Sequence, residues 1–249
     1  MFTLDPVTAS IVTAAFLVSG VVKGAVGIGQ ATTAVAILTT ALGLREAVPL
    51  LMVPTLIANA WQVRQGGSLG PLFKRFWGLN AMACLGVWLG TMILFAIDPA
   101  ALAAVLGVVV CLYAAINLTR WTIRMKATRE RWLSPIAGLV SGVLTGSTGS
   151  LHLLSIVYFQ ALGLEKDRFV QACGLTFLMG TVIWAASLAE RGALNATTAT
   201  ISALALIPTL CGMAAGSWLR ARVSEALFRR WVWIGMIVLG LNLIRKSLM

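Results

Sequence analysis

The stretch SGVVKGAVGIGQ, residues 19–30, places four glycines and one lysine between long apolar segments. SGVLTGSTGS, residues 141–150, repeats its pattern about 122 residues later. Ser, Gly, Val, Gly and Gly stand in register in the two stretches, and ALGL follows each, at 41–44 and 161–164. Glycine permits a backbone with positive φ and a close approach of neighbouring groups. The two stretches are therefore where an otherwise apolar chain is expected to bend.

Composition places these stretches in a membrane protein. Hydrophobic residues make up 59% of the 249 residues and charged residues only 11%, whereas soluble domains carry about 25% charged residues. Apolar runs near the length of about 20 residues that crosses a bilayer recur along the chain, without the alternation of barrel strands. The expected fold class is an all-α, polytopic helical membrane protein, with the lipid bilayer as its partner.

The net charge of +11 does not indicate nucleic-acid binding. The basic residues stand in short loops between apolar runs, where orientation bias explains them. The four cysteines lie in apolar runs with no CxxC pair, which predicts small buried hydrophobes rather than disulfide or metal partners. A lone histidine is no zinc site. We therefore expect no cofactor, no metal and no nucleic-acid partner.

An internal repeat extends beyond the glycines. Further positions match in the same order: Trp61 with Trp184, GGSL at 66–69 with RGAL at 191–194, Gly86 and Gly90 with Gly212 and Gly216, and Asn117 with Asn242. These matches predict a single membrane domain made of two repeats, residues 1–119 and 133–249. The basic segment 120–132 joins them as a cytoplasmic linker.

Each half divides in the same way, into an apolar segment that enters the glycines, a short piece and three longer runs. The short pieces, 28–40 and 150–160, cannot cross the hydrocarbon alone. Each half is thus predicted to hold a broken or re-entrant helical hairpin with the glycines at its tip, followed by three transmembrane helices. The longer runs are 46–63, 75–96 and 99–119 in the first half and 168–189, 197–219 and 225–245 in the second.

Loop charges predict the orientation. With the linker in the cytoplasm, 14 of the 19 basic residues fall on the cytoplasmic side. Both termini then lie outside, the first hairpin enters from the outside and the second from the inside. The repeats are therefore expected to have inverted topology, as in many secondary transporters.

The glycine tips favour an anion site. Irregular backbone at membrane depth needs water, protein or a ligand to satisfy its N–H groups. The short helices begin just after the tips, so their N-termini offer free N–H donors and the positive end of the helix dipole. Packing is the competing role, since glycines four residues apart let helices approach closely. We expect packing for Gly20, Gly138 and Gly142, and ligand contact for Gly27, Gly29 and Gly149.

Polar side chains near the tips are further candidates. Lys23 is the only lysine or arginine deep in a predicted span; such a charge suggests function, with snorkelling as the alternative. His152 opens the second short helix, as a neutral donor, a titrating group or a core residue. The other candidates carry hydroxyl or amide groups, for which helix capping is a compatible role: Gln30, Thr32, Thr33, Thr145, Ser147, Thr148 and Ser150.

The acidic residues narrow the class of substrate. All eight fall at predicted span edges or in loops. A cation transporter or a carboxylate proton relay would place one near the midplane, and an enzyme would need paired acid and base groups or a metal cluster. A small anion fits the remaining inventory, and no enzymatic activity is expected.

Several motifs resemble one known family. GAVGIGQ (24–30) precedes a short apolar helix and ALGL, GSTGSLH (146–152) is its second copy, and GxxxG recurs at 86–90 and 212–216. With these motifs the chain resembles the sulfite exporter TauE/SafE family of bacterial anion permeases along nearly its whole length. The resemblance implies a duplicated inner-membrane protein that transports sulfite, organosulfonates or related sulfur anions. Its motifs point to Gly24, Gly27, Gly29, Gly146 and Gly149.

The expected function is a multi-pass secondary transporter of a small sulfur-containing anion in the cell inner membrane. Export is favoured, by alternating access with the anion at two opposed helix N-termini. Proton-coupled uptake involving His152 and an anion channel remain alternatives, as does a non-transporting subunit of a larger complex. Whether the chain forms a homo-oligomer is left open.

Overall fold

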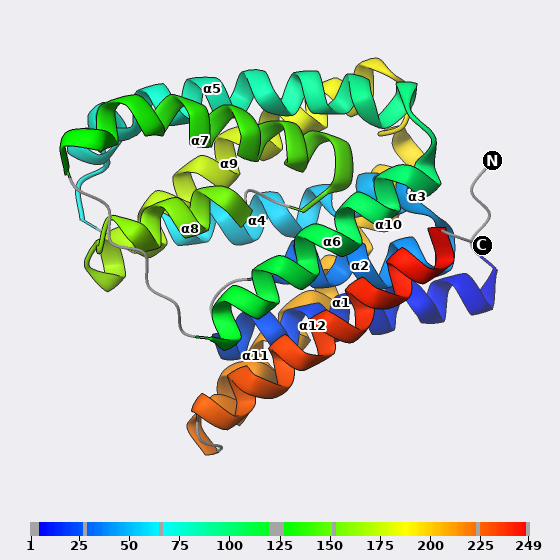
Figure 1. The fold of residues 1–249 in the computed structure, drawn as a ribbon. Helices are drawn as coiled ribbons and strands as arrows, with labels where there is room; N and C mark the ends of the chain where they lie inside the picture. The colour runs from blue at the N-terminus through cyan, green and yellow to red at the C-terminus, as the bar shows by residue number, and fades with distance from the viewer. Residues whose placement is uncertain are drawn as a thin grey trace. The chain divides into compact units, whose positions relative to one another are not determined.

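The computed structural model describes residues 5–26, 29–64, 67–119, 127–150, 153–222 and 225–247. Within these ranges every regular element is a helix (Figure 1), which confirms the predicted all-α fold. The helices are α1 (Pro6–Val26), α2 (Gln30–Leu42), α3 (Leu44–Leu50), α4 (Met52–Val63), α5 (Leu69–Ala96), α6 (Pro99–Leu118), α7 (Ala127–Thr148), α8 (Leu153–Ala161), α9 (Lys166–Glu190), α10 (Ala196–Leu204), α11 (Leu206–Arg222) and α12 (Glu225–Ser247).

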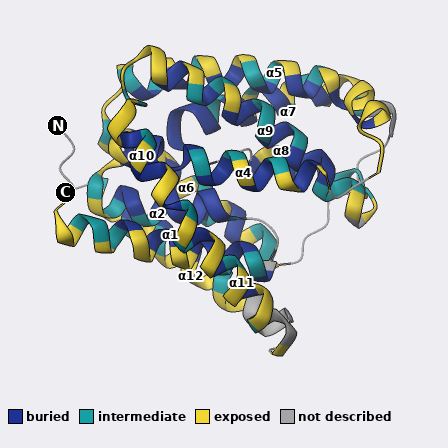
Figure 2. Ribbon diagram, turned by 180° about the vertical axis from the view of Figure 1, so that it is seen from behind, coloured by how far each residue is buried: buried dark blue, intermediate teal, exposed yellow. Residues whose placement is uncertain are grey.

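The helices after the glycine tips are short, as predicted. α2 has 13 residues and α8 has nine. At about 1.5 Å per residue they extend roughly 20 Å and 14 Å, less than the roughly 30 Å of a hydrocarbon core. α2 is mainly buried, whereas α5 alternates between buried and exposed residues (Figure 2).

Two runs that were expected to be single helices are each divided in two. The run 46–63 is interrupted at Leu51 between α3 and α4, and the run 197–219 at Ala205 between α10 and α11. A proline follows three residues after each interruption, at Pro54 and Pro208. Proline has no N–H to donate to the carbonyl four residues earlier, and its ring clashes there. The prolines account for both breaks.

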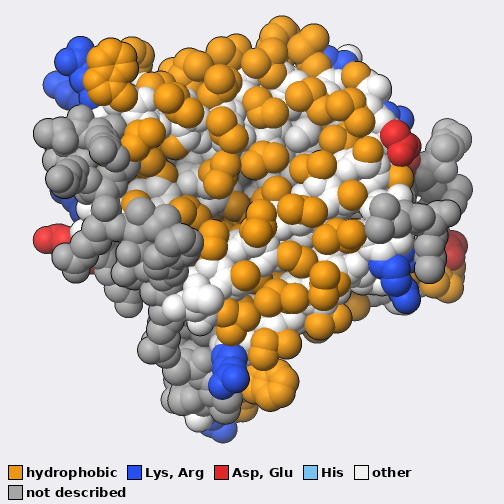
Figure 3. Space-filling model, in the orientation of Figure 1, with side chains coloured by type: hydrophobic (Ala, Val, Ile, Leu, Met, Phe, Trp, Pro, Cys, Tyr) orange, Lys and Arg blue, Asp and Glu red, His pale blue; other side chains and the backbone are white. Residues whose placement is uncertain are grey.

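The described helices have the dimensions and surface of a polytopic membrane protein. Hydrophobic side chains spread over the helix surfaces on the face drawn in Figure 3. Exposed side chains such as Leu112 and Val238, at 59% and 61% exposure, would meet lipid rather than water. Within the described residues, five segments are long and apolar enough to cross a membrane: Pro6–Ala25, Leu69–Ala96, Pro99–Leu118, Asp167–Glu190 and Ala196–Leu219.

The chain folds into two compact units, each of which combines helices from both sequence halves. Unit 1 comprises Met1–Pro54, Ile97–Arg120 and Gly192–Met249; unit 2 comprises Thr55–Ala96 and Trp121–Arg191. The first hairpin, α1 and α2, belongs to unit 1, and the second, α7 and α8, belongs to unit 2. The sequence repeats and the compact units are thus different divisions of the same chain.

In unit 1, glycines bring α1 against α11. A Cβ atom on Gly20 would overlap the Thr209 carbonyl oxygen and would lie 3.1 Å from the Gly212 Cα. From the other side, a Cβ on Gly212 or Gly216 would overlap the backbone of α1. The expected packing role of Gly20 is confirmed, and Gly24 has the same role against Met213.

In unit 2, the equivalent glycines bring α7 against α5, which run side by side in Figure 1. A Cβ on Gly142 would overlap the Ala83 carbonyl oxygen, and one on Gly146 that of Val87. Gly86 and Gly90 make the reciprocal approach, and Gly138 packs against Leu79. Packing is therefore confirmed for Gly138 and Gly142. Apart from Gly138, the glycines at both crossings are those paired by the sequence repeat.

Candidate functional site

The first candidate region is the turn between α1 and α2 in unit 1. Gly27 and Ile28 lie outside the described residues, and the description resumes at Gly29. Gly29 has φ 95°, a left-handed conformation that favours glycine. Its carbonyl accepts the first hydrogen bond of α2, from the Thr33 N–H at 2.9 Å.

The N-terminus of α2 is buried and carries no side-chain cap. The N–H groups of Gln30, Ala31 and Thr32 precede the first helical bond and have no acceptor within the helix. Gly29, the N-cap residue, has no side chain to supply one. The three residues are only 4%, 4% and 2% exposed. Buried donors in this position need a partner, and the positive end of the helix dipole favours an anionic one.

The second candidate region is the end of α7 and the start of α8 in unit 2. Gly149 has φ 73°, and its N–H donates to the Thr145 carbonyl at 2.9 Å, which closes the last turn of α7. Leu151 and His152 lie outside the described residues, so the role predicted for His152 stays a prediction. α8 then begins at Leu153, which is buried.

The comparison with protein families assigns the chain as a whole to a family. The model of the family described as Sulfite exporter TauE/SafE matches residues 12–243, nearly the whole chain, including both turns. The chain belongs to this family. TauE/SafE proteins are membrane anion transporters and not enzymes, and the resemblance found in the sequence is confirmed at that level. Comparisons with curated proteins and with solved structures gave no match.

In this TauE/SafE family member, two side chains beside the α2 N-terminus keep unused donors. The Gln30 Nε2 and Thr33 Oγ1 atoms are buried and have no hydrogen-bond partner among the described residues. The two residues are 4% and 3% exposed. A buried polar group without a partner costs roughly 1–3 kcal/mol. A bound anion that accepts from these groups would offset that cost.

Lys23 lies in the last turn of α1 and is only 9% exposed. A cation at this position also stabilises the negative end of the helix dipole. Lys23 also takes part in an interaction with another group, so it is not without a partner. A structural role at the end of α1 and contact with an anion are both compatible with this position.

Three of the predicted hydroxyls in the second region use their protons locally. Thr145 donates to the Ser141 carbonyl at 2.8 Å, Ser147 to that of Val143 at 2.7 Å, and Thr148 to that of Leu144 at 2.6 Å. A hydroxyl has a single proton. In these rotamers the three hydroxyls therefore have no proton left to donate in a hydrogen bond to an anion.

Ser150 differs from those three residues. It is 1% exposed, and its Oγ atom has no partner among the described residues. Among the described residues, its own N–H makes a long contact of 3.4 Å to the Thr148 Oγ1. Of the hydroxyls predicted for the second region, Ser150 alone keeps an uncommitted donor in the described structure.

Two serines of unit 2 were not predicted as site residues. The Ser141 Oγ accepts a hydrogen bond from the Ser155 N–H at 3.2 Å and so caps the first turn of α8. Ser155 is fully buried, and its own Oγ has no partner among the described residues. Ser141 heads the repeated SGV pattern and could have been found there. Ser155 lies outside both glycine stretches, and nothing in the pattern marked it.

The acidic side chains that the structure describes are mainly exposed. Among the acidic side chains that the structure describes, Glu130 alone is partly buried, and it forms an ion pair with Arg75. The others are exposed. The two turns belong to different compact units, so each stands here as a separate candidate, and their union around one anion stays a prediction.

Proposed function

We propose that this TauE/SafE family member is a secondary transporter that exports a small sulfur oxyanion, such as sulfite or an organosulfonate, across the inner membrane. The observation that carries the proposal is the buried, uncapped N-terminus of α2, with Gln30 and Thr33 keeping unused donors beside it. Sulfite and sulfonate oxygens act as hydrogen-bond acceptors. A site that offers N–H, amide and hydroxyl donors, away from carboxylates, suits such an anion.

The substrate-binding residues in this proposal come from both turns. The first turn supplies Gly27, Gly29, Gln30, Thr32 and Thr33, and the last turn of α1 adds Lys23. The second supplies Gly149, Ser150 and His152, and we add Ser155 for its buried Oγ. Thr145, Ser147 and Thr148 would support the turn through their bonds to α7 rather than touch the anion.

Alternating access would follow from two inverted repeats, residues 1–119 and 133–249, joined by the basic segment 120–132. The paired glycine crossings support this arrangement, because each repeat's hairpin packs on the equivalent helix of the other repeat. The bias of basic residues supports a cytoplasmic linker and external termini.

Export agrees with the membrane potential. With the inside negative, moving one negative charge outward releases roughly 2.3 kcal/mol per 100 mV, so no carboxylate is needed for proton coupling. Proton-coupled uptake involving His152 is the second candidate. An anion channel would use the same donors without alternating access.

Flux in proteoliposomes tests the function. The protein is reconstituted with sulfite inside, a potential is set with potassium and valinomycin, and efflux is followed against a panel of sulfonates, thiosulfate and sulfate. The proposal expects saturable sulfite efflux that grows with the potential and is accelerated by sulfite on the opposite side. Unsaturable flux without such counterflow would identify a channel. Flux driven only by a pH gradient and lost in His152→Ala would favour coupled uptake.

A further inference from the structure

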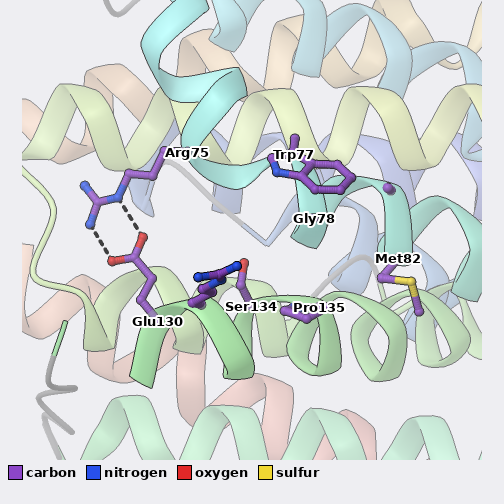
Figure 4. A pocket seen from close by; sticks show the side chains of 9 residues that line it. Arg75, Trp77, Gly78, Met82, Glu130, Ser134 and Pro135 are labelled. Carbon is purple, nitrogen blue, oxygen red and sulfur yellow. Dashed lines mark hydrogen bonds and ion pairs between the residues drawn. The ribbon is translucent and has the colours of Figure 1, made fainter. Parts of the chain in front are cut away.

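A groove lies between α5 and α7 inside unit 2, and its lining does not include the turn between α7 and α8. Its volume is about 620 Å³. Figure 4 shows the Trp77 ring on one side of the gap and Ser134 and Pro135 on the other. The lining residues are Arg75, Trp77, Gly78, Ala81, Met82, Glu130, Arg131, Ser134 and Pro135. We infer that this groove binds an anionic phospholipid.

One end of the groove is polar and carries excess positive charge. The Arg75 Nε donates to Glu130 Oε1 at 2.7 Å and its Nη2 to Oε2 at 2.9 Å, a bidentate pair in which the two charges offset each other. Arg131 has no acidic partner among the described residues. The charge that remains in the groove is therefore that of Arg131, next to the Ser134 hydroxyl, and it favours a phosphate group.

The acidic residue of the groove is held in place and unavailable to a cation. The Tyr158 hydroxyl of α8 donates to the Glu130 backbone carbonyl at 3.3 Å, while Arg75 occupies both carboxylate oxygens. A choline or ethanolamine headgroup would need that carboxylate. The groove thus discriminates in favour of a headgroup with net negative charge.

The rest of the lining is apolar and suits an acyl chain. Trp77 is 65% exposed, and Met82 and Pro135 continue the apolar wall along the two helices. A Cβ on Gly78 would meet no atom within 4 Å, so this glycine leaves the groove open. A soluble oxyanion would leave this apolar wall uncovered, whereas a phospholipid would cover the polar end with its headgroup and the apolar wall with an acyl chain.

The groove also lies at the depth of a lipid headgroup. Arg75 directly precedes Phe76, where non-helical backbone kinks α5, so Arg75 stands at the N-terminal end of the long apolar part of this candidate membrane span. Exposed Trp77 and Trp132, at 65% and 76%, mark the interfacial region where tryptophan is enriched. Basic pockets between transmembrane helices at this level are typical sites for anionic headgroups.

Native mass spectrometry of the detergent-solubilised full chain tests the inference. Phosphatidylglycerol and phosphatidylcholine of equal chain length are added together, with inorganic phosphate as a separate competitor. The inference expects preferential retention of phosphatidylglycerol, unaffected by millimolar phosphate. Arg131→Gln should reduce the preference about fivefold, the effect of one interfacial charge. Gly78→Leu should abolish retention by filling the groove.

Gly235→Leu is the matched control, because Gly235 of α12 also has open space around it but lies outside the groove. It should retain phosphatidylglycerol as the wild type does. Equal retention by Gly78→Leu and wild type, or displacement of the lipid by phosphate, would overturn the inference. A Gly78→Leu variant that changed the oligomeric state without changing lipid retention would instead assign the groove to a second copy of the chain.

Discussion

The hydroxyl of Ser202 bridges the break between α3 and α4 by donating to the Leu50 carbonyl at 2.8 Å. The same oxygen accepts a hydrogen bond from the Val53 N–H at 2.9 Å. Pro54 cannot donate to the Leu50 carbonyl, so the break would leave that carbonyl unsatisfied in an apolar interior. A side chain on α10, 152 residues away, replaces the lost helix bond.

Ser202→Ala should therefore destabilise the protein by about 1–3 kcal/mol, because it leaves the buried Leu50 carbonyl and the partly buried Val53 N–H without their hydrogen-bond partner. Thermal unfolding in detergent measures the loss. Thr200→Ala is the control, since Thr200 lies on the same helix, is exposed and bonds only within α10. Equal melting temperatures for Ser202→Ala and wild type would show that another group satisfies Leu50.

The close packing at the glycine crossings predicts that two glycine substitutions in α5 have opposite effects on the stability of the protein. Gly90→Ala should destabilise by about 1–3 kcal/mol, because its methyl group would overlap the Val143 carbonyl of α7. Gly78→Ala should be neutral or stabilise by up to about 1 kcal/mol, since nothing lies near and alanine favours helix. Melting temperatures of the two variants check the order. A reversed order would refute close backbone packing at Gly90.

The hydroxyls of the second turn should differ in their effect on transport. Ser150→Ala should raise the KM for sulfite roughly tenfold, because a donor to a charged ligand is removed. Thr148→Val should leave the KM unchanged, because the Thr148 proton already goes to Leu144. Initial efflux rates over a sulfite series give both values. A KM effect of Thr148→Val equal to that of Ser150→Ala would mean that the Thr148 hydroxyl turns toward the anion.

Gln30 offers the corresponding test in the first turn. Gln30→Ala should raise the KM about tenfold or more through loss of its Nε2 donor. Gln160→Ala, at an exposed position of α8, should transport as the wild type does. A Gln30→Ala variant with wild-type KM would remove this side chain from the site while leaving the backbone donors to be tested separately.

The sequence predicted the elements that depend on local rules. The glycine stretches and the segment lengths are enough to predict that α2 and α8 are short helices. The breaks at Leu51 and Ala205 also have a local cause, because Pro54 and Pro208 each remove a helical hydrogen bond, whereas the length of the apolar runs alone predicts continuous helices.

Long-range and rotamer-dependent features could not be predicted in this way. Ser202 stands far along the chain from the break it bridges, and no local pattern connects the two. Side-chain rotamers decide that the Thr148 hydroxyl donates to the Leu144 carbonyl and that the Ser150 hydroxyl keeps an unused donor among the described residues. The repeat also matches positions without matching their surroundings: Trp61 is 62% exposed, while its counterpart Trp184 is fully buried.

An anion bound at the N-terminus of α2 is the central feature of the proposed transporter. Selenite is a close analogue of sulfite whose selenium scatters anomalously, so crystals soaked in selenite would locate the anion directly. We predict an anomalous peak within about 4 Å of the amide nitrogens of Gln30, Ala31 and Thr32. Selenite bound elsewhere, or a continuous helix from α1 into α2 with no peak beside it, would contradict the account.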